Sequence, residues 1–370
     1  MRNLDRRNWL RTVGLSSGFA LLGGFESFAL ETSIKSPKLE GLVRLSSNEN
    51  PYGPSKRVRE IITNTFDDAC RYPFGALSSL VEMIAEKEGV TKDHVVVTGG
   101  STEGLKAVGL TYGLNGGELI AADPTFQSML TYAETFGAHV HRVPVNENME
   151  HDLEAMSKRV NNKTNLIFIC NPNNPTGTLL NKNALKDFCA SHDNQAMIFS
   201  DEAYYDFITE PEYPSMTELV KEGRNIIVSK TFSKVFGLAG MRIGYLIARP
   251  DIAKRLKASV MANTNILAIE AAKEALRDNE FYKFSVLKNK EAKDQIYATL
   301  DGLGLEYIPS HTNFVFFKTG RPVDQIISAM QRENVLIGRP FPPLLDWARI
   351  STGTLPQVAE FSKALKKVMG

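Results

Sequence analysis

The segment from Lys230 to Arg242 carries the residues best suited to nucleophilic chemistry. Lys234 follows the hydroxyl residues Thr231 and Ser233 and precedes a Gly- and Ala-rich apolar stretch that ends at Arg242. An amine becomes a nucleophile near neutral pH when partial desolvation lowers its pKa. Neighbouring hydroxyl groups and an arginine could bind a dianionic phosphate. Taken alone, Lys234 could equally be one of many solvated surface lysines. Its assignment as a nucleophile therefore depends on the other segments of the sequence.

Two further segments place polar side chains where apolar runs end. Asp201 follows the run 196–200, and its carboxylate could pair with the protonated nitrogen of a heterocycle, which makes such a ring a stronger electron sink. A helix cap is the alternative role for this residue. The segment 171–177 reads Asn-Pro-Asn-Asn-Pro-Thr-Gly and follows the run 166–170. Its prolines and glycine predict a rigid turn that presents the amide of Asn174, with a plain loop as the alternative.

A glycine-rich turn at 99–104 follows the run 94–98 and opens an apolar helical pattern. Small residues here leave backbone N–H groups free at the positive end of a helix dipole, an arrangement that suits phosphate. Such a turn alone is a weak signal.

Seven short apolar runs have to position these residues. They alternate with helical patterns and are nearly continuous, as in strands that are covered on both faces. The runs are His94–Thr98, Glu118–Ala122, His139–Val143, Leu166–Cys170, Ala196–Ser200, Asn225–Ser229 and Arg242–Ala248. This order predicts an α/β fold with a mostly parallel seven-stranded sheet, whose ligands bind in loops at the carboxyl ends of the strands.

The last third of the chain has a different pattern and predicts a smaller α+β domain. The expected elements are one long helix over 255–300, strands at 305–307 and 313–317, and a helix over 325–333. We therefore expect a signal peptide at 1–29, a linker and arm at 30–70, a large domain at 71–250, and a small C-terminal domain at 251–370.

Composition sets broad limits on function. The 370 residues are 43% hydrophobic and 23% charged, with a net charge of +1, which is an ordinary globular composition that gives no support for nucleic-acid binding. Cys70, Cys170 and Cys189 have no paired spacing and no nearby His cluster. We therefore expect neither a disulfide framework nor a metal site, and we expect all three cysteines to be small buried side chains.

The first 29 residues have the order of an export signal. Arg6 and Arg7 precede a weakly apolar stretch from Val13 to Leu22, and small residues near Ala29 offer a cleavage site. The arginine pair is typical of a twin-arginine signal, and the apolar stretch is too short and glycine-rich for a stable membrane span. We expect a periplasmic protein, with an amphipathic helix on a cytoplasmic enzyme as the alternative.

In their order and spacing, the four loops resemble those of fold-type I pyridoxal-phosphate (PLP) aminotransferases of class I/II, most closely the histidinol-phosphate aminotransferase branch. Three more segments share that pattern, namely Ser47–Pro54, Arg71–Pro73 and Ala348–Thr354. The resemblance extends from about Leu45 to the C-terminus. It implies a homodimeric PLP enzyme that moves an amino group between an amino acid or amine and a 2-oxo acid.

The resemblance also implies roles for the matching residues around the cofactor. Lys234 would form the internal aldimine and move the proton, Asp201 would keep the pyridine nitrogen protonated, and Phe126 would stack on the ring. Tyr204 and Asn174 would hydrogen-bond the phenolic oxygen. The phosphate would be held by Ser101, Thr102, Thr231, Ser233, Arg242 and, across the dimer interface, Tyr72 of the neighbouring copy.

On the substrate side, the resemblance implies that Arg349 clamps a carboxylate in a bidentate pair. The residues that would complete this pocket are Arg339, Tyr52, Asn174 and Asn313. A second positive group would suit a phosphorylated or acidic side chain, and a surface salt bridge is the alternative for Arg339. Phe126 stands where the branch usually has tyrosine, and Phe74 where an acidic residue is common, so substrate identity does not transfer directly.

Other reactions remain open on the same fold. O-phosphothreonine decarboxylases closely resemble this branch, and racemases use the same fold. A non-catalytic PLP-binding relative is a third possibility, although every expected catalytic position carries a competent residue and no added helix-turn-helix domain is found. Export argues against routine histidine biosynthesis, so we expect a different substrate.

Overall fold

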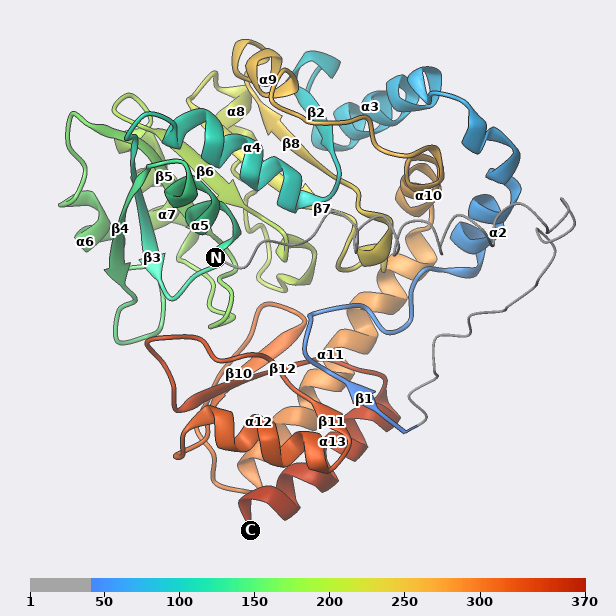
Figure 1. Ribbon diagram of the computed structural model, residues 1–370, viewed down its shortest axis with the longest axis vertical. Coiled ribbons are helices and arrows are strands. Elements are labelled where there is room, and N and C mark those ends of the chain that lie inside the picture. Colours follow the sequence, from blue (N-terminus) through green and yellow to red (C-terminus); the bar gives the residue numbers. More distant parts are fainter. Residues whose placement is uncertain (1–40) are drawn as a thin grey trace, which may run out of the picture. The chain divides into compact units, whose positions relative to one another are not determined.

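The computed structural model describes residues 41–370 (Figure 1). The expected signal peptide and the linker up to residue 40 therefore lie outside the described part of the chain. A seven-stranded sheet forms the centre of the large domain. Its strands are β2 (Val95–Thr98), β3 (Glu118–Asp123), β4 (His139–Pro144), β5 (Thr164–Cys170), β6 (Met197–Asp201), β7 (Ile226–Thr231) and β8 (Gly244–Ala248).

The strand order in this sheet is β2-β8-β7-β6-β5-β3-β4. The five strands from β7 to β4 run parallel, whereas β8 is antiparallel to both of its neighbours. All seven predicted runs form strands, with ends shifted by one or two residues. The predicted α/β fold with a mostly parallel sheet is confirmed.

The two faces of the sheet belong to two separate hydrophobic clusters. Along β5, Ile167 and Ile169 pack into one cluster, and Leu166 and Phe168 pack into the other. Successive side chains of a strand point to opposite faces. Burial on both faces therefore explains why the runs in the sequence are continuously apolar rather than alternating.

Helices cover this sheet on both sides (Figure 1). They include α3 (Phe74–Glu88), α4 (Ser101–Gly113), α5 (Ser128–Thr135), α6 (Leu153–Ser157), α7 (Lys182–His192), α8 (Thr217–Lys221) and α9 (Pro250–Lys257). Helix α10 (Ile266–Arg277) packs on α3, and α2 (Lys56–Asn64) packs on α10. Short 3-10 turns lie at η2 (Phe66–Cys70), η3 (Lys92–His94), η4 (Tyr205–Phe207) and η5 (Ala239–Met241). Among residues 41–370, no helix is both long and apolar enough to cross a membrane.

The C-terminal part builds a second, smaller sheet with its own core. The antiparallel strands are β9 (Tyr307–Ile308), β10 (Phe314–Lys318) and β12 (Trp347–Ser351). The accompanying helices are α11 (Asn279–Asp301), α12 (Val323–Arg332) and α13 (Leu355–Met369). A separate parallel pair joins β1 (Val43–Arg44) to β11 (Val335–Leu336), and Leu45 is buried in the same core.

Two expectations from the sequence are wrong. The range 255–300 is not one helix, because α9 ends at Lys257 and two new helices begin at caps. Asn265 accepts a hydrogen bond from the N–H of Ala268 at 2.8 Å, and Asp278 starts α11 in the same way. Cys70 is exposed at the end of η2, where no residue is buried, whereas the other two cysteines are buried as expected.

Candidate functional site

A cavity of about 300 Å³ opens at the carboxyl ends of β5, β6 and β7. Its walls come from loops after these strands, from the segment after β1, and from β12 and the loop before it. The predicted site residues that line it are Ser101, Thr102, Phe126, Asn174, Asp201, Tyr204, Ser233, Lys234, Arg242, Arg339 and Arg349. The structure therefore brings together most of the residues that the sequence singled out.

Lys234 projects into this cavity from the loop after β7. Its Nζ donates a hydrogen bond to the carbonyl oxygen of Asn48 at 3.0 Å and lies 5.4 Å from the centroid of the Tyr204 ring. Burial, followed by the nearby charge of Arg349, lowers the pKa of Lys234 to about 8. This amine therefore loses its proton far more easily than a surface lysine.

A close backbone contact holds the Lys234 loop in place. A Cβ on Gly53 would lie 2.5 Å from the Cα of Gly237, and Gly237 also has a φ of +69°. Only glycine fits both conditions, because a side chain would meet backbone and the left-handed region is strained for other residues. The loop 47–54 is thus pressed directly against the loop that carries Lys234.

Asp201 is the buried acid of the site. It is 2% exposed, and its Oδ1 accepts a hydrogen bond from the N–H of Ala203 at 3.2 Å. Burial raises the pKa of Asp201 to about 7. The alternative role as a helix cap is wrong, because the 3-10 turn that follows begins at Tyr205 and has Tyr204 as its cap. A buried carboxyl of this kind is suited to pairing with a cationic ring nitrogen.

A hydrogen-bonded chain links Tyr204 to Arg349. The hydroxyl of Tyr204 accepts from the amides of Asn48 at 2.9 Å and Asn174 at 3.5 Å. Asn174 Oδ1 accepts from Nη1 of Arg349 at 2.6 Å, and Nη2 of Arg349 donates to the carbonyl of Ser46 at 2.9 Å. Burial lowers the pKa of Arg349 to about 10. Its Nε is buried without a partner among the described residues.

The other end of the cavity fits a phosphate group. Gly100 precedes α4 and supplies no side-chain cap, so the first N–H groups of this helix are free. The guanidinium of Arg242 lies over this turn, donates to Ala239 O at 2.8 Å and lies 3.5 Å from Thr102 Oγ1. A Cβ on Gly100 would stand 2.4 Å from Nη2 of Arg242. The hydroxyl groups of Ser101 and Ser233 complete this wall.

Two guanidinium groups share one aromatic ring at the mouth of the cavity. Arg339 and Arg349 lie 4.5 Å and 4.7 Å from the centroid of Phe341. Arg339 is exposed and donates to its neighbour Pro340 O at 2.8 Å. Within residues 41–370 no carboxylate pairs with Arg339, so the salt-bridge alternative finds no partner there.

Four predicted site residues do not line this cavity. Thr231 donates to Ser233 Oγ at 2.9 Å and lines a second cavity, which Glu88 and Lys230 also line. Tyr52 and Asn313 line a small neighbouring pocket, and the Asn313 amide donates to Asn48 O at 3.0 Å. Tyr72 is 80% exposed and stacks on Phe74 at 5.7 Å between ring centroids.

Other residues of the cavity were given no role from the sequence. Asn48 bonds to Tyr204, accepts from Lys234 and exchanges hydrogen bonds with Ser351. Its φ of 54° is in the left-handed region, and an asparagine in a segment rich in Pro and Gly is the signal that could have found it. Glu49 and Phe341 also line the cavity, but nothing in the sequence distinguishes Phe341 from a loop residue.

Comparison with known proteins gives a consistent result. The family model described as aminotransferase class I and II matches residues 40–365. Histidinol-phosphate aminotransferases of Moorella thermoacetica and Bacillus cytotoxicus are 36% and 34% identical, over 90% of this chain and 86% and 90% of theirs. A histidinol-phosphate aminotransferase from Sinorhizobium meliloti, solved in complex with pyridoxal 5'-phosphate, shares the fold with a TM-score of 0.83 and 24% identity, over 89% of this chain and 91% of that one.

Proposed function

Since this chain belongs to the aminotransferase class I and II family, we propose that its amino donor is an amine that carries an anionic group at the end far from the nitrogen, such as a phosphate ester. The protein is a PLP-dependent aminotransferase, and its substrates are an amino donor and a 2-oxo acid. Bound PLP supplies an electron sink for the bond that breaks at the donor carbon. The class of the amino donor is inferred from Arg339 and Arg349, the two arginines beside Phe341.

The pair of guanidinium groups on Phe341 is the observation that carries this proposal. Arg349 lines the cavity, and two hydrogen bonds fix its buried guanidinium, so it suits a carboxylate held in a fixed geometry. Arg339 is exposed at the mouth and suits an anion that is more distant from the reacting carbon. A donor with an anion at its far end would engage Arg339, and the 2-oxo acid would engage Arg349 in the second half-reaction.

We propose the following roles for the other residues of the cavity. Lys234 Nζ takes the proton from the donor carbon, because its lowered pKa leaves the amine free to accept one. Asp201 would hold a proton on the ring nitrogen of the cofactor, and Tyr204 and Asn174 would donate to its phenolic oxygen. The N-terminus of α4 and Arg242 hold the phosphate.

The test compares matched donors with 2-oxoglutarate as the acceptor. Histidinol phosphate and histidinol differ only in the phosphate, and glutamate and carbon dioxide are both measured. We expect glutamate, with kcat/KM for the phosphorylated donor reduced about 10- to 100-fold by Arg339→Met and kcat/KM for histidinol unchanged. An equal loss on both donors would refute the role of Arg339. A third donor, O-phosphothreonine, carries a carboxyl group, and carbon dioxide without glutamate from this donor would point to a decarboxylase.

We also propose that the enzyme is a homodimer in which Tyr72 reaches the neighbouring cofactor's phosphate. The support is that Tyr72 and Phe74 are 80% and 66% exposed and stacked, although both are large aromatic side chains. Sedimentation analysis tests the dimer. Mixed dimers of Tyr72→Ala and Lys234→Ala protomers, which regain part of the lost activity only if the residues act across the interface, test the crossing.

Export by a twin-arginine signal is the last part of the proposal. Arg6-Arg7, followed by the weakly apolar stretch, supports it. Cell fractionation of the native chain and of an Arg6→Lys/Arg7→Lys variant is the test. Periplasmic protein that is lost in the variant is expected, and a native chain retained in the cytoplasm would refute it.

A further inference from the structure

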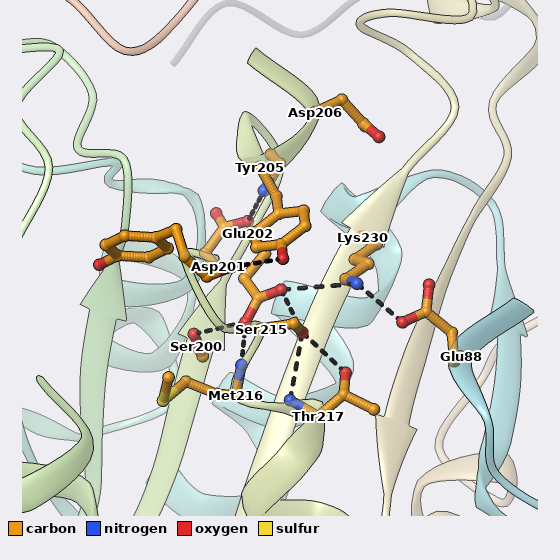
Figure 2. Close-up of polar contacts among 12 residues, drawn as sticks. Glu88, Ser200, Asp201, Glu202, Tyr205, Asp206, Ser215, Met216, Thr217 and Lys230 are labelled. Carbon is orange, nitrogen blue, oxygen red and sulfur yellow. Dashed lines mark hydrogen bonds and ion pairs between the residues drawn. The ribbon is translucent and has the colours of Figure 1, made fainter. Parts of the chain in front are cut away.

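A buried ion cluster lies next to the cofactor site and has no part in the chemistry described above. Figure 2 shows Lys230 between the carboxylates of Glu88 and Glu202, and these three residues are called the Lys230 cluster. Nζ of Lys230 is 2.7 Å from Glu88 Oε2 and 3.6 Å from Glu202 Oε2. The side chains are 13%, 6% and 4% exposed, so the cluster is nearly shielded from water.

Neutral donors complete the cluster. Tyr245 donates its hydroxyl to Glu88 Oε1 at 2.7 Å. Ser215 Oγ and the N–H of Met216 each donate to Glu202 at 2.7 Å. Buried charges are tolerated only when they are paired and hydrogen-bonded in this way. The cluster thereby joins α3, the ends of β6 and β7, β8 and the loop before α8 into one unit.

The charges in the cluster do not balance. Two carboxylates share one ammonium group, and burial raises the pKa of Glu202 even though Lys230 is close. For Glu88, burial opposes ionisation, but the charge and hydrogen bond of Lys230 outweigh it and hold the pKa of Glu88 below its ordinary value. Lys230 therefore forms the tighter pair with Glu88 and reaches Glu202 as a second partner.

The cluster touches both strands that carry the reacting groups. Glu202 directly follows Asp201, and since successive residues point to opposite sides, Asp201 lines the cofactor cavity while Glu202 lies in the cluster. The N–H of Glu202 donates to Ser229 O at 2.9 Å. Lys230 lies four residues before Lys234 and, with Glu88, lines a second cavity of about 550 Å³.

We infer that Lys230 is a positioning residue: its ion pairs with Glu88 and Glu202 hold the ends of β6 and β7 together, and so fix Asp201 against Lys234 on the cofactor side. The inference rests on the roles proposed for Asp201 and Lys234. A shift of either strand end would misplace the carboxylate, the amine and the cofactor between them. Misplacement of reacting groups lowers the rate of the chemical step more than it lowers substrate affinity.

Three variants of the PLP-loaded enzyme test this inference against a matched control. Lys230→Met removes the charge at similar length, Lys230→Arg keeps the charge, and Glu88→Gln leaves the pair between Lys230 and Glu202. The control is Asp193→Asn. Asp193 is 4% exposed and accepts from Arg224 Nη1 and from the N–H of Asn225, both at 3.2 Å, at the opposite end of β7.

The readouts are kcat and KM separately, the visible circular dichroism of bound PLP, which depends on ring orientation, and urea stability. We expect Lys230→Met to lower kcat about tenfold or more with KM nearly unchanged, and to change the dichroism. Lys230→Arg should restore both. Asp193→Asn should lower stability alone. Native kcat and dichroism in Lys230→Met, or equal changes in Asp193→Asn, would overturn the inference.

Two further outcomes keep the test decisive. If Lys230→Met does not fold, Glu88→Gln decides, since a loosened cluster should lower kcat about threefold at constant KM, and a native value overturns the inference. Lys234→Ala separates this inference from the proposed site. If that variant keeps the absorbance of lysine-bound PLP, the site assignment fails. If it loses the absorbance while the Lys230 variants are native, only the positioning role fails.

Discussion

Replacing Asp201 with asparagine should make the cofactor-free enzyme more stable and the loaded enzyme inactive. Asparagine keeps the size of the side chain and can still accept from the N–H of Ala203. It cannot ionise, so it removes the cost of a buried carboxylate. It also removes the negative charge that the cofactor's ring nitrogen requires. Comparison of the variant with the native enzyme therefore separates the effect of the Asp201 charge on stability from its effect on catalysis.

The size of the effect follows from the pKa of Asp201. Burial raises this pKa from 3.8 to about 7 in the folded chain. The folded state then holds the proton more tightly than the unfolded state, so stability is lost as the pH rises from about 4 to about 7. The cost to the cofactor-free native enzyme is roughly 2 kcal/mol at pH 5 and roughly 4 kcal/mol at pH 8.

Urea unfolding of the cofactor-free native and Asp201→Asn proteins at pH 5 and pH 8 measures this difference. We expect the variant to gain more stability at pH 8 than at pH 5, by roughly 2 to 3 kcal/mol. Its affinity for PLP and its kcat should both fall. A stability difference that does not depend on pH would refute the reasoning, because Asp201 would then have the same pKa in the folded and unfolded chains.

Three other substitutions are expected to change PLP binding or the KM of the substrates. Gly100→Ala should weaken PLP binding about tenfold or more, measured by fluorescence titration, because the new Cβ would lie 2.4 Å from Nη2 of Arg242 at a φ of +81°. Arg349→Lys should raise KM for the 2-oxo acid about 10- to 100-fold through loss of the planar fork. Phe341→Ala should raise KM for both substrates, because both guanidinium groups stack on its ring.

Each of these predictions has a control and a contrary result. Gly116→Ala has a similar positive φ with open space around it, so it should leave PLP binding unchanged. Equal losses in both glycine variants would assign the effect to backbone strain alone. An unchanged KM in Arg349→Lys would move carboxylate recognition elsewhere, and a loss for one substrate only in Phe341→Ala would mean that the ring supports one arginine.

The sheet, and the gathering of the loops after its strands around one cavity, could be predicted from the sequence because both depend on local patterns. Strands buried on both faces leave continuous apolar runs, and the loops after them carry Asp201, Asn174 and Lys234 in a fixed order. The single helix expected over 255–300 was wrong because apolar spacing is similar on both sides of a cap. Asn265 and Asp278 act as breaks only when their side chains bond to the backbone.

The substrate side could not be derived in the same way. Phe341 reaches the cavity because a loop rich in proline places it beside β12. The spacing of apolar residues in the sequence does not predict a contact made by such a loop. The Lys230 cluster joins residues that are more than a hundred positions apart, such as Glu88 and Lys230. Tertiary pairing of this kind leaves no trace in local spacing, so it is visible only once the chain is folded.

The segment from Leu45 to Gly53 connects the core of the smaller sheet to the loop after β7 of the seven-stranded sheet. β1, which precedes this segment, pairs with β11, and Leu45 is buried in the hydrophobic core next to the smaller sheet. The last residue of the segment, Gly53, presses backbone to backbone on Gly237, beside Lys234. This short segment therefore connects the core that contains Ala348 and Ile350 of β12 directly to the loop that carries Lys234. The positions of Arg349 and of the lysine thus depend on the same stretch of backbone.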